Sequence, residues 1–358
     1  MNEARIIEGC RRKGLVLGLG LGLSLSLAAG CSDEGSGGES TSGPGIDLSA
    51  GSTRGSDGQG DDLDVLDGSE SSEGLDATFR CNNVDFVFVV DNSPSMLDEQ
   101  QFLVQGVPGF ISAMQNAIPN LESFRVGVID TDSYPGLGTL EAPLDGCDPE
   151  AVDDCEACDY TLGAFLTKPQ SAIDPEITCD FSTGQSYMDG TSETFANEFG
   201  CAAVVGAVGN PIEQQAGALV AAVSSDLLEP GACNEGFVRD DALLVFLVIS
   251  DEEDNHASPP EPGGSLGEPK EWYEAIVAAK GGHDANVVGL GLLGGSPKFD
   301  DCADLSQGVD GAEQSSRLVD FVERFPTHFV GSVCSDGYGG FFQEALDRVA
   351  TGCANFIP

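Results

Sequence analysis

The chain has 358 residues, and its 60 Asp and Glu against 15 Lys and Arg give it a formal net charge of −45. This charge excludes nucleic acids and anionic membrane surfaces as partners of the folded part, and it favours cations and basic protein surfaces. Hydrophobic residues make up 41% of the sequence, which excludes a protein that is disordered throughout.

Residues 1–30 have the pattern of an export signal. Basic residues at 11–13 precede an apolar stretch at 15–29. That stretch is too short to cross a bilayer comfortably, so it predicts a cleaved signal peptide rather than a transmembrane helix. The small residues before Cys31 resemble the cleavage site of a bacterial lipoprotein, which implies that Cys31 is lipidated and anchors the protein to a membrane.

Two residues beside Cys31 bear on this interpretation. The lipoprotein pattern usually has Leu three positions before the cysteine, whereas Ala28 stands here, so cleavage by the ordinary signal peptidase is the alternative. Ser32 follows the cysteine, and by resemblance to Gram-negative lipoproteins it implies sorting to the outer membrane. We therefore expect a cell-envelope lipoprotein of the outer membrane, either periplasmic or exposed at the surface.

Residues 31–79 form a predicted tether. The segment is rich in Gly, Ser, Asp and Glu and has almost no large apolar residues, so it cannot bury enough surface to offset the entropy lost on ordering. Its Asp-rich part at 57–68 offers a calcium loop as an alternative, but the spacing of an EF-hand loop is incomplete. We expect a flexible, disordered acidic spacer.

Residues 80–358 alternate the patterns of strands and helices. The first apolar run is short and rich in Val, as a strand buried on both faces should be. Such alternation implies one α/β domain with an open, mostly parallel sheet and helices on both faces. Ligands of these sheets bind beyond the carboxyl ends of the strands. The predicted strands are Val84–Val90, Phe124–Ile129, Ala242–Ile249, Ala285–Leu293 and Thr327–Val333, and the predicted helices are Leu97–Ile118, Ile212–Leu227, Glu271–Lys280, Gln314–Arg324 and Gly340–Thr351.

The stretch 131–208 shows neither pattern, and we expect it to be a long cysteine-rich insertion that is either held by disulfides or functional. Of the 12 cysteines in the chain, ten are left when Cys10 and Cys31 are set aside, and an even number in an exported chain predicts a disulfide framework. Cys155 and Cys158 also have the CxxC spacing of redox and zinc sites. Structural bridges are favoured, because neither a second CxxC nor a thioredoxin-like context accompanies them.

The residues directly after the first predicted strand offer metal ligands. Asp91, Ser93 and Ser95 stand at alternate positions, and in a tight turn their carboxylate and two hydroxyls can converge on one side. Such hard oxygen ligands suit Mg²⁺, Mn²⁺ or Ca²⁺ rather than zinc. Capping of the helix that begins near Met96 is the alternative role, since Ser and Asp are good N-caps.

This DxSxS pattern resembles the metal-ion-dependent adhesion site of von Willebrand factor A (VWA) and integrin I domains, whose sheet is Rossmann-like. In that family a second carboxylate follows a later central strand, and Asp251 follows the apolar strand ALLVFLVIS here. The resemblance implies that Asp91, Ser93, Ser95 and Asp251 bind a divalent cation. It also implies that an acidic residue of a partner protein completes the coordination of the ion.

The sequence departs from the family at one ligand. The family usually has a Thr in a G-G-x-T loop before the helix that precedes the central strand, and no Thr occurs in the corresponding segment 205–214. Glu213, Asn210 or a water molecule are the candidates for its place. The residues at 130–132, Asp-Thr-Asp, follow the second strand and are expected near the same edge of the sheet. The acidic residues at 252–254 are expected to form a solvated loop outside the coordination sphere.

The resemblance also bears on the disulfides. Cys81 precedes the first strand and Cys353 follows the last helix, so they are neighbours if the ends of this fold meet, and some VWA domains have such a bridge. By the chain-entropy model a bridge across so long a loop adds on the order of 4 kcal/mol of stability. Cys302 and Cys334 are the second predicted pair, whereas the pairing among the cysteines at 147–233 is left open.

The resemblance implies recognition rather than catalysis. We expect a metal-dependent module that mediates protein–protein interaction or adhesion at the cell envelope, and not an enzyme. No P-loop, no GxSxG and no GxGxxG after a predicted strand is present, and His256, His283 and His328 share no ligand spacing. Two alternatives stay open: a structural envelope protein in which the cation stabilises the fold, and an exported hydrolase with its substrate site in the cysteine-rich insertion.

Overall fold

Six strands form the central sheet of the protein in a computed structural model, in the order β3-β2-β1-β4-β5-β8. Neighbouring strands are parallel except at one edge, where β2 pairs antiparallel with β3. The predicted α/β class with a mostly parallel sheet is thus present. The strands are β1 (Asn83–Val90), β2 (Ser123–Ile129), β3 (Met188–Asp189), β4 (Ala242–Ser250), β5 (Val287–Leu293) and β8 (Thr327–Ser332), and β6 (Ala303–Asp304) pairs with β7 (Gly311–Ala312) in a separate small sheet.

The structure describes residues 81–118, 120–132, 156–168, 178–206, 213–255, 264–295, 302–304 and 311–358. The predicted signal peptide, the lipidation site Cys31 and the tether lie outside these ranges. Cys147, Cys155, Asn210 and His256 also lie outside them. None of the described helices combines the length and the hydropathy that a bilayer crossing requires.

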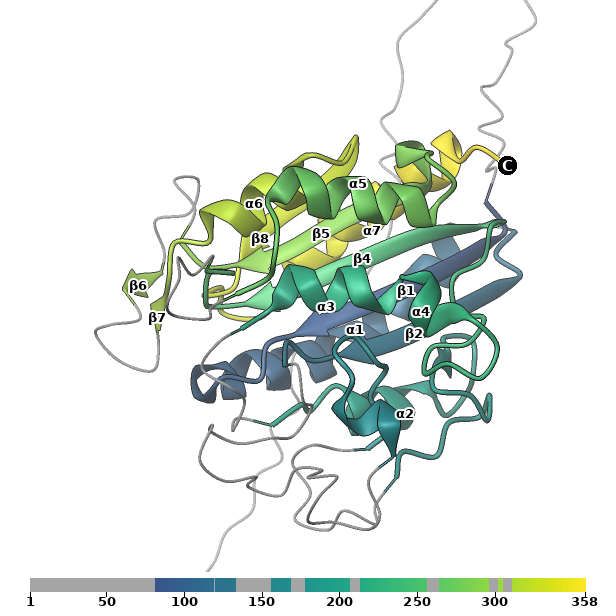
Figure 1. The fold of residues 1–358 in the computed structure, drawn as a ribbon, viewed down its shortest axis with the longest axis horizontal. Helices are drawn as coiled ribbons and strands as arrows, with labels where there is room; N and C mark the ends of the chain where they lie inside the picture. The colour runs from purple at the N-terminus through teal and green to yellow at the C-terminus, as the bar shows by residue number, and fades with distance from the viewer. Residues whose placement is uncertain are drawn as a thin grey trace, which may run out of the picture. The chain divides into compact units, whose positions relative to one another are not determined.

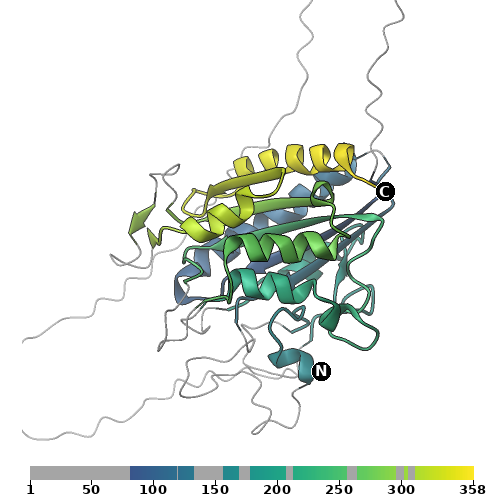
Figure 2. The same cartoon turned by 45° about the horizontal axis from the view of Figure 1, so that its top comes forward.

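Helices cover both faces of the sheet (Figures 1 and 2). On one face α3, α5 and α6 pack on side chains of β1, β4 and β5, and on the other face α1, α2 and α7 pack on the alternate side chains of the same strands. The helices are α1 (Leu97–Ala117), α2 (Phe195–Ala202), α3 (Gln215–Ala222), α4 (Ser225–Leu228), α5 (Pro269–Ala279), α6 (Ser316–Glu323) and α7 (Gly339–Asn355), with short 3-10 turns η1 (Pro94–Met96), η2 (Ala157–Tyr160) and η3 (Asp284–Asn286).

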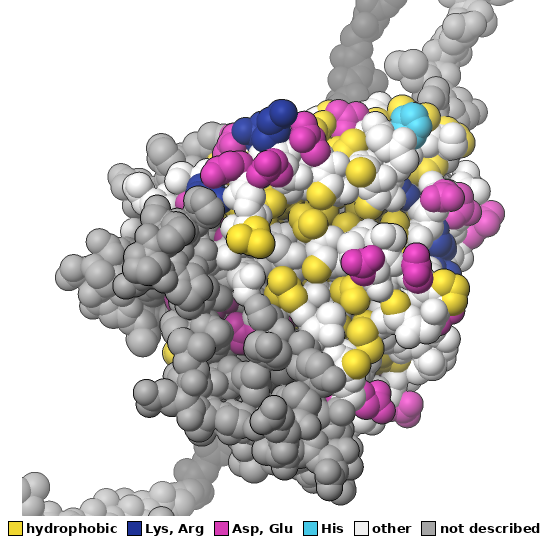
Figure 3. All heavy atoms as spheres, in the orientation of Figure 1, with side chains coloured by type: hydrophobic (Ala, Val, Ile, Leu, Met, Phe, Trp, Pro, Cys, Tyr) yellow, Lys and Arg dark blue, Asp and Glu magenta, His cyan; other side chains and the backbone are white. Residues whose placement is uncertain are grey.

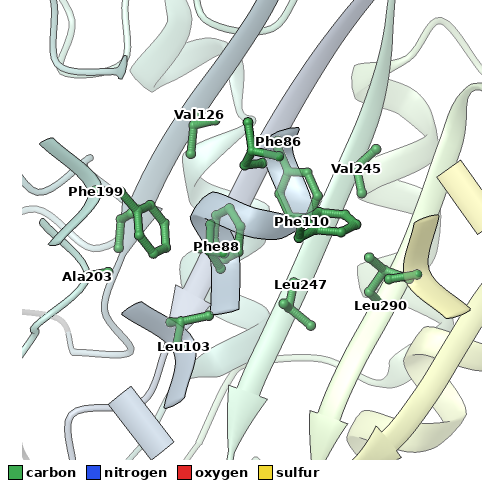
Figure 4. Packing of buried hydrophobic residues seen from close by; sticks show 14 of the residues in the cluster. Phe86, Phe88, Leu103, Phe110, Val126, Phe199, Ala203, Val245, Leu247 and Leu290 are labelled. Atoms are coloured by element: carbon green, nitrogen blue, oxygen red, sulfur yellow. The ribbon is translucent and has the colours of Figure 1, made fainter. Parts of the chain in front are cut away.

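The core explains why these segments take these forms. All nine residues of β4 are buried, as expected for a central strand covered on both faces. Phe86 and Phe88 of β1 lie on the same face because their spacing is two residues, and their rings stack with centroids 4.4 Å apart. Phe110 of α1 meets Phe86 edge-on at 5.9 Å, so helix and strand interlock through aromatic rings (Figure 4).

The predicted helix Ile212–Leu227 is wrong in extent. The structure has two shorter helices, α3 and α4, separated at Val223 and Ser224. Ser224 takes an extended backbone conformation, and the side chain of Asn234 donates to the carbonyl oxygen of Ala222 at 3.0 Å. A carbonyl that would continue the helix is therefore bonded to a side chain 12 positions further along the chain, which helical periodicity alone cannot reveal.

The predicted insertion at 131–208 is less irregular than expected. Its described part contains the edge strand β3 and the helix α2, and Phe199 of α2 is fully buried against Phe88 of the sheet. Both elements are too short to have a clear period in the sequence. The described part of the insertion therefore extends the sheet and covers part of one face.

Four disulfides join described cysteines. Both predicted pairs are confirmed: Cys81 is bonded to Cys353 and Cys302 to Cys334. The pairing left open within the cysteine-rich part is Cys158 with Cys233 and Cys179 with Cys201. Since Cys158 is bonded to a cysteine 75 positions away, it is not part of a CxxC disulfide.

Candidate metal centre

The candidate ligands lie where β1 and β4 end. These strands are adjacent and parallel, with Val90 paired to Ile249, so the residues that follow them emerge at the same edge of the sheet, at the left in Figure 1. The backbone amide of Asp91 donates to the carbonyl oxygen of Ile249 at 3.0 Å and extends the ladder by one bond. Asp91 and Asp251 are both buried at this edge, with 0% and 1% of their surface exposed.

Ser93 and Ser95 direct their hydroxyls toward one another and toward Asp251. Their Oγ atoms lie 3.1 Å apart, and Ser93 Oγ lies 3.5 Å from Asp251 Oδ1. Asp91 Oδ1 accepts a hydrogen bond from the backbone amide of Ser93 at 2.7 Å, which closes the turn. The structure therefore brings together Asp91, Ser93, Ser95 and Asp251, the four residues that the sequence singled out.

The capping interpretation of these serines does not fit the structure. Ser93 is the N-cap of η1, but its side chain makes no capping hydrogen bond. The N-cap of α1 is Met96, which has no side-chain oxygen to offer. The hydroxyls of Ser93 and Ser95 therefore make no capping bond and lie on the side of the turn that carries the carboxylates.

A hydrogen-bond network holds Asp91 in place. Ser250 Oγ donates to Asp91 Oδ2 at 2.5 Å and accepts from Gln215 Nε2 of α3 at 2.9 Å. Gln100 of α1 donates to the backbone carbonyl oxygens of Asp91 at 3.1 Å and of Gly206 at 2.7 Å. Asp91 is therefore oriented by residues from three elements, and sequence reasoning did not identify Ser250, Gln215 or Gln100.

Glu213 stands in the segment where the adhesion-site family has its Thr. It precedes α3, is buried, and accepts a hydrogen bond at Oε2 from the hydroxyl of Thr131. Its other oxygen, Oε1, has no hydrogen-bond partner among the described residues. Of the candidates raised from the sequence, Glu213 and Thr131 thus come together, whereas Asn210 lies outside the described residues.

The other two candidates after β2 are buried beside Thr131. Asp132 accepts a hydrogen bond from Asn92 Nδ2 at 3.0 Å, and its backbone amide donates to Asp130 Oδ1 at 3.3 Å. Asp130 Oδ2 has no hydrogen-bond partner among the described residues. Burial, together with the charge of Asp132, raises the pKa of Asp130 well above its usual range.

The pKa values of the site carboxyls rise because negative charges are buried close together. Burial, then the charge of Asp91, raises the pKa of Asp251 to about 7. Burial and the charges of Asp91 and Asp251 raise the pKa of Glu252 to about 8. Burial and then Asp91 and Asp132 raise the pKa of Glu213 well above the usual range. A cation among these groups would offset their repulsion.

Glu253 and Asp254 do not form the solvated loop that the sequence led us to expect. Glu253 accepts hydrogen bonds from the backbone amides of Arg317 at 2.8 Å and Leu318 at 3.3 Å, at the start of α6. Asp254 is fully buried and accepts from the amide of Ala216 at 2.9 Å, at the start of α3. These bonds satisfy amides that lack partners within their helices, and they fix the segment that carries Asp251 between two helices.

The described ion pairs leave Asp91, Asp251 and Glu213 without a Lys or Arg partner. Asp251 Oδ2 also has no hydrogen-bond partner in this part of the chain. No group of three or more His, Cys, Asp and Glu side chains placed to hold a metal occurs among the described residues. The arrangement instead combines carboxylates with serine hydroxyls, a donor set suited to Mg²⁺, Mn²⁺ or Ca²⁺.

Similarity to known proteins does not indicate a function for this site. No protein-family model matches the chain, and no curated protein matches it. Among solved structures, proximal thread matrix protein 1 from the mussel byssus is similar, with 10% sequence identity and a TM-score of 0.38 over 76% of this chain. The match covers 49% of that protein, about half of its length. A likeness at this level carries no argument about function, which therefore rests on the site itself.

Proposed function

We propose that this protein is a VWA-like, lipid-anchored module of the cell envelope that binds a divalent cation and uses it to hold a partner protein. The observation that carries the proposal is the convergence of Asp91, Ser93, Ser95 and Asp251 at one edge of the sheet, with Asp251 Oδ2 buried and without a hydrogen-bond partner among the described residues. Buried polar atoms are rarely left in this state unless an ion, a water molecule or a ligand satisfies them.

The donor set fits Mg²⁺, Mn²⁺ or Ca²⁺. Asp91 and Asp251 would supply charge, and Ser93 and Ser95 would supply neutral oxygens, which leaves the ion with a positive charge to attract an acidic group. Glu213 stands in the segment that would carry the missing Thr, and its Oε1, which has no hydrogen-bond partner among the described residues, makes it the candidate for that position. When bound, the cation would act as an electrophilic anchor for a carboxylate of the partner.

The positions of these residues in the fold support the VWA assignment. The DxSxS turn follows β1, the second carboxylate follows β4, and β1 and β4 are neighbours in the sheet. Asp91 is oriented by Ser250, and Asp251 lies on a segment that α3 and α6 hold at their first turns. This arrangement is suited to rigid recognition, because the ligands are placed before any ion or partner arrives.

Titration calorimetry of Mg²⁺, Mn²⁺ and Ca²⁺ into the purified protein tests the proposal. We expect saturable binding that is lost in Asp91→Asn and in Asp251→Asn, both close in shape to the native side chain. Asp226→Asn is the matched control, because Asp226 is exposed on the short helix α4. Absence of binding by the wild-type protein would contradict the proposal.

The structural alternative makes a different prediction. If the cation only stabilises the fold, the melting temperature rises with the metal, but no protein binds in a metal-dependent way. Metal-dependent binding of an envelope or surface protein, lost in Asp91→Asn, would instead favour the recognition function.

A further inference from the structure

The small sheet of β6 and β7 lies beyond the edge of the central sheet at which β1 and β4 end (Figures 1 and 2). Two residue pairs join its strands, Ala303 with Gly311 and Asp304 with Ala312. A two-stranded ladder of this size is marginally stable on its own in water. Its position therefore depends on how it is attached to the rest of the domain.

The residue that follows this small sheet holds the backbone of a candidate ligand. Glu313 comes directly after β7, and its backbone amide donates to the carbonyl oxygen of Asp251 at 2.7 Å. The carboxylate of Glu313 accepts a hydrogen bond from the backbone amide of Glu253 at 3.1 Å. Gly294 permits this close approach, because a Cβ atom there would lie 2.4 Å from the carbonyl oxygen of Glu313. The segment that carries Asp251 is thus fixed by the end of β7.

The other strand of the small sheet is joined covalently to the central sheet. Cys302 directly precedes β6 and is bonded to Cys334, which lies two residues after the end of β8. The hydroxyl of Ser332, the last residue of β8, accepts a hydrogen bond from the backbone amide of Cys334 at 3.3 Å and lies 3.5 Å from Cys302 Sγ. The disulfide therefore attaches β6 to the end of β8, and through the ladder it also holds β7 and Glu313.

Both cysteines of this bridge are partly exposed, so a reductant can reach the sulfur atoms from solvent. The bridge between Cys81 and Cys353 differs in both respects that matter here. Its cysteines are fully buried, and it lies at the opposite edge of the sheet, where β1 begins. Reduction at that bridge would be slow and would act far from the candidate ligands.

The two bridges of the cysteine-rich insertion are placed elsewhere. Cys158 and Cys233 are partly exposed, but their bridge joins η2 to the turn between α4 and the amino end of β4. Cys179 is buried, and its bridge to Cys201 fastens α2. Among the described disulfides, the bridge before β6 is the one that combines access from solvent with attachment to the metal centre.

We propose that a dithiol protein of the cell envelope reduces the disulfide between Cys302 and Cys334, and that cation binding at the metal centre then weakens. A thiolate of the reductant attacks one sulfur atom, the S–S bond breaks, and the second thiol of the reductant releases the chain from the mixed disulfide. The chain gains two electrons and two protons as two thiols, and the reductant leaves as a disulfide. Without the bridge, Glu313 no longer fixes the backbone of Asp251, and a ligand that is less well placed binds the cation less tightly.

This inference rests on the proposed function and adds redox control to it. Calorimetric titration of Mg²⁺ into the oxidised protein and into protein treated with dithiothreitol tests it. Acidic side chains outnumber basic ones on the visible surface, so an uncharged dithiol is the suitable probe (Figure 3). We expect reduction to lower the Mg²⁺ affinity about tenfold, as the loss of contacts around a metal ligand does. Alkylation and mass spectrometry should find new thiols at Cys302 and Cys334, with the bridge between Cys81 and Cys353 intact.

Two double variants assign the effect to one bridge. Cys302→Ser/Cys334→Ser should have the lowered affinity without any reductant, and dithiothreitol should lower it no further. Cys158→Ser/Cys233→Ser is the matched control, because it removes the other partly exposed bridge; it should bind Mg²⁺ as the wild type does and lose affinity only on reduction. The inference is overturned if reduction leaves the wild-type affinity unchanged, or if dithiothreitol weakens Cys302→Ser/Cys334→Ser as much as the wild type.

Glu313 supplies a test that leaves every disulfide in place. Glu313→Ala removes the acceptor for the amide of Glu253 and should weaken Mg²⁺ binding about tenfold. Glu313→Gln loses the charge but keeps an acceptor oxygen, so it should bind Mg²⁺ nearly as the wild type does. An unchanged affinity in Glu313→Ala, or an equal loss in Glu313→Gln, would contradict the proposed connection to Asp251. The oxidised wild-type protein tells the two proposals apart, because only its failure to bind Mg²⁺ would overturn the proposed function as well.

Discussion

Ser250 Oγ donates a hydrogen bond of 2.5 Å to Asp91 Oδ2, and so joins the last residue of β4 to the first residue after β1. The two residues are 159 positions apart in the chain, and neither is exposed. Ser250 Oγ also accepts hydrogen bonds from Gln215 Nε2 at 2.9 Å and from the backbone amide of Glu252 at 3.1 Å, so contacts from α3 and from the turn after β4 hold this hydroxyl beside the carboxylate. The candidate metal centre thus has its orientation set by a side chain that is not itself a proposed ligand.

The variant Ser250→Ala should therefore weaken cation binding without removing a ligand. It should also lower the free energy of unfolding by about 1–3 kcal/mol, because it leaves Asp91 and Gln215 with unmet hydrogen bonds in the core. Urea unfolding and calorimetry measure the two effects. Ser225→Ala, at an exposed serine of α4, is the control and should change neither. An unchanged cation affinity in Ser250→Ala would show that the network does not position Asp91.

The buried carboxyls predict an unusual dependence of stability on pH in the absence of metal. The pKa of Asp251 is raised from 3.8 to about 7 and that of Glu252 from 4.5 to about 8, so the folded protein holds these protons more tightly than the unfolded chain does. The contribution of these two carboxyls to stability is present below about pH 4, and it is lost as the pH rises through their pKa values in the folded protein. Melting temperatures in chelator should accordingly fall between about pH 5 and pH 8.5.

Addition of Mg²⁺ should change this profile. Cations bind ionised carboxylates, so Mg²⁺ affinity should increase over the range in which Asp251 loses its proton, and the melting temperature should fall less steeply with pH. The same titration on Asp251→Asn should show a smaller pH dependence in chelator and little effect of Mg²⁺. A flat melting profile for the metal-free wild-type protein would contradict the electrostatic description of the site.

Glu213→Gln should have opposite effects on the two states of the protein. In chelator the variant should melt at a higher temperature at about pH 8, because it removes a buried carboxyl whose charge is repelled by Asp91 and Asp132. The rise in melting temperature on addition of Mg²⁺ should be smaller for the variant than for the wild type, since Glu213 is the candidate for the position of the missing Thr. Equal metal-induced shifts in variant and wild type would exclude Glu213 as a ligand.

The bridge between Cys81 and Cys353 should support the fold but not the metal centre. It joins the start of β1 to the end of α7, whereas the candidate ligands follow the opposite ends of β1 and β4. The variant Cys81→Ala/Cys353→Ala should lose about 2–5 kcal/mol of unfolding free energy, and its Mg²⁺ affinity should match that of the wild type. Denaturant unfolding and calorimetry check both parts. A large loss of Mg²⁺ affinity would mean that the amino ends of the strands, where the disulfide lies, are coupled to the carboxyl ends, where the candidate ligands lie.

The sequence was most informative where local pattern decides the structure. All five predicted strands agree with observed strands within two residues at each end, because short, mostly apolar runs bounded by polar residues are best buried as strands of a covered sheet. It was least informative where a hydrogen bond from outside the segment determines the local structure. The break between α3 and α4 depends on Asn234, and the role of Glu253 depends on the amides of Arg317 and Leu318.

By itself the sequence determined the alternation of strands and helices, and with it the edge at which Asp91 and Asp251 had to emerge. This follows because parallel strands that each end in a ligand place those ligands at the same side of the sheet. Only the tertiary structure decided which other residues meet there. Thr131 donates a hydrogen bond to Glu213, 82 positions away, and the ring of Phe102 contacts that of Tyr338 beside the metal centre. Packing of the elements brings these segments together, and their local sequences do not indicate that they meet.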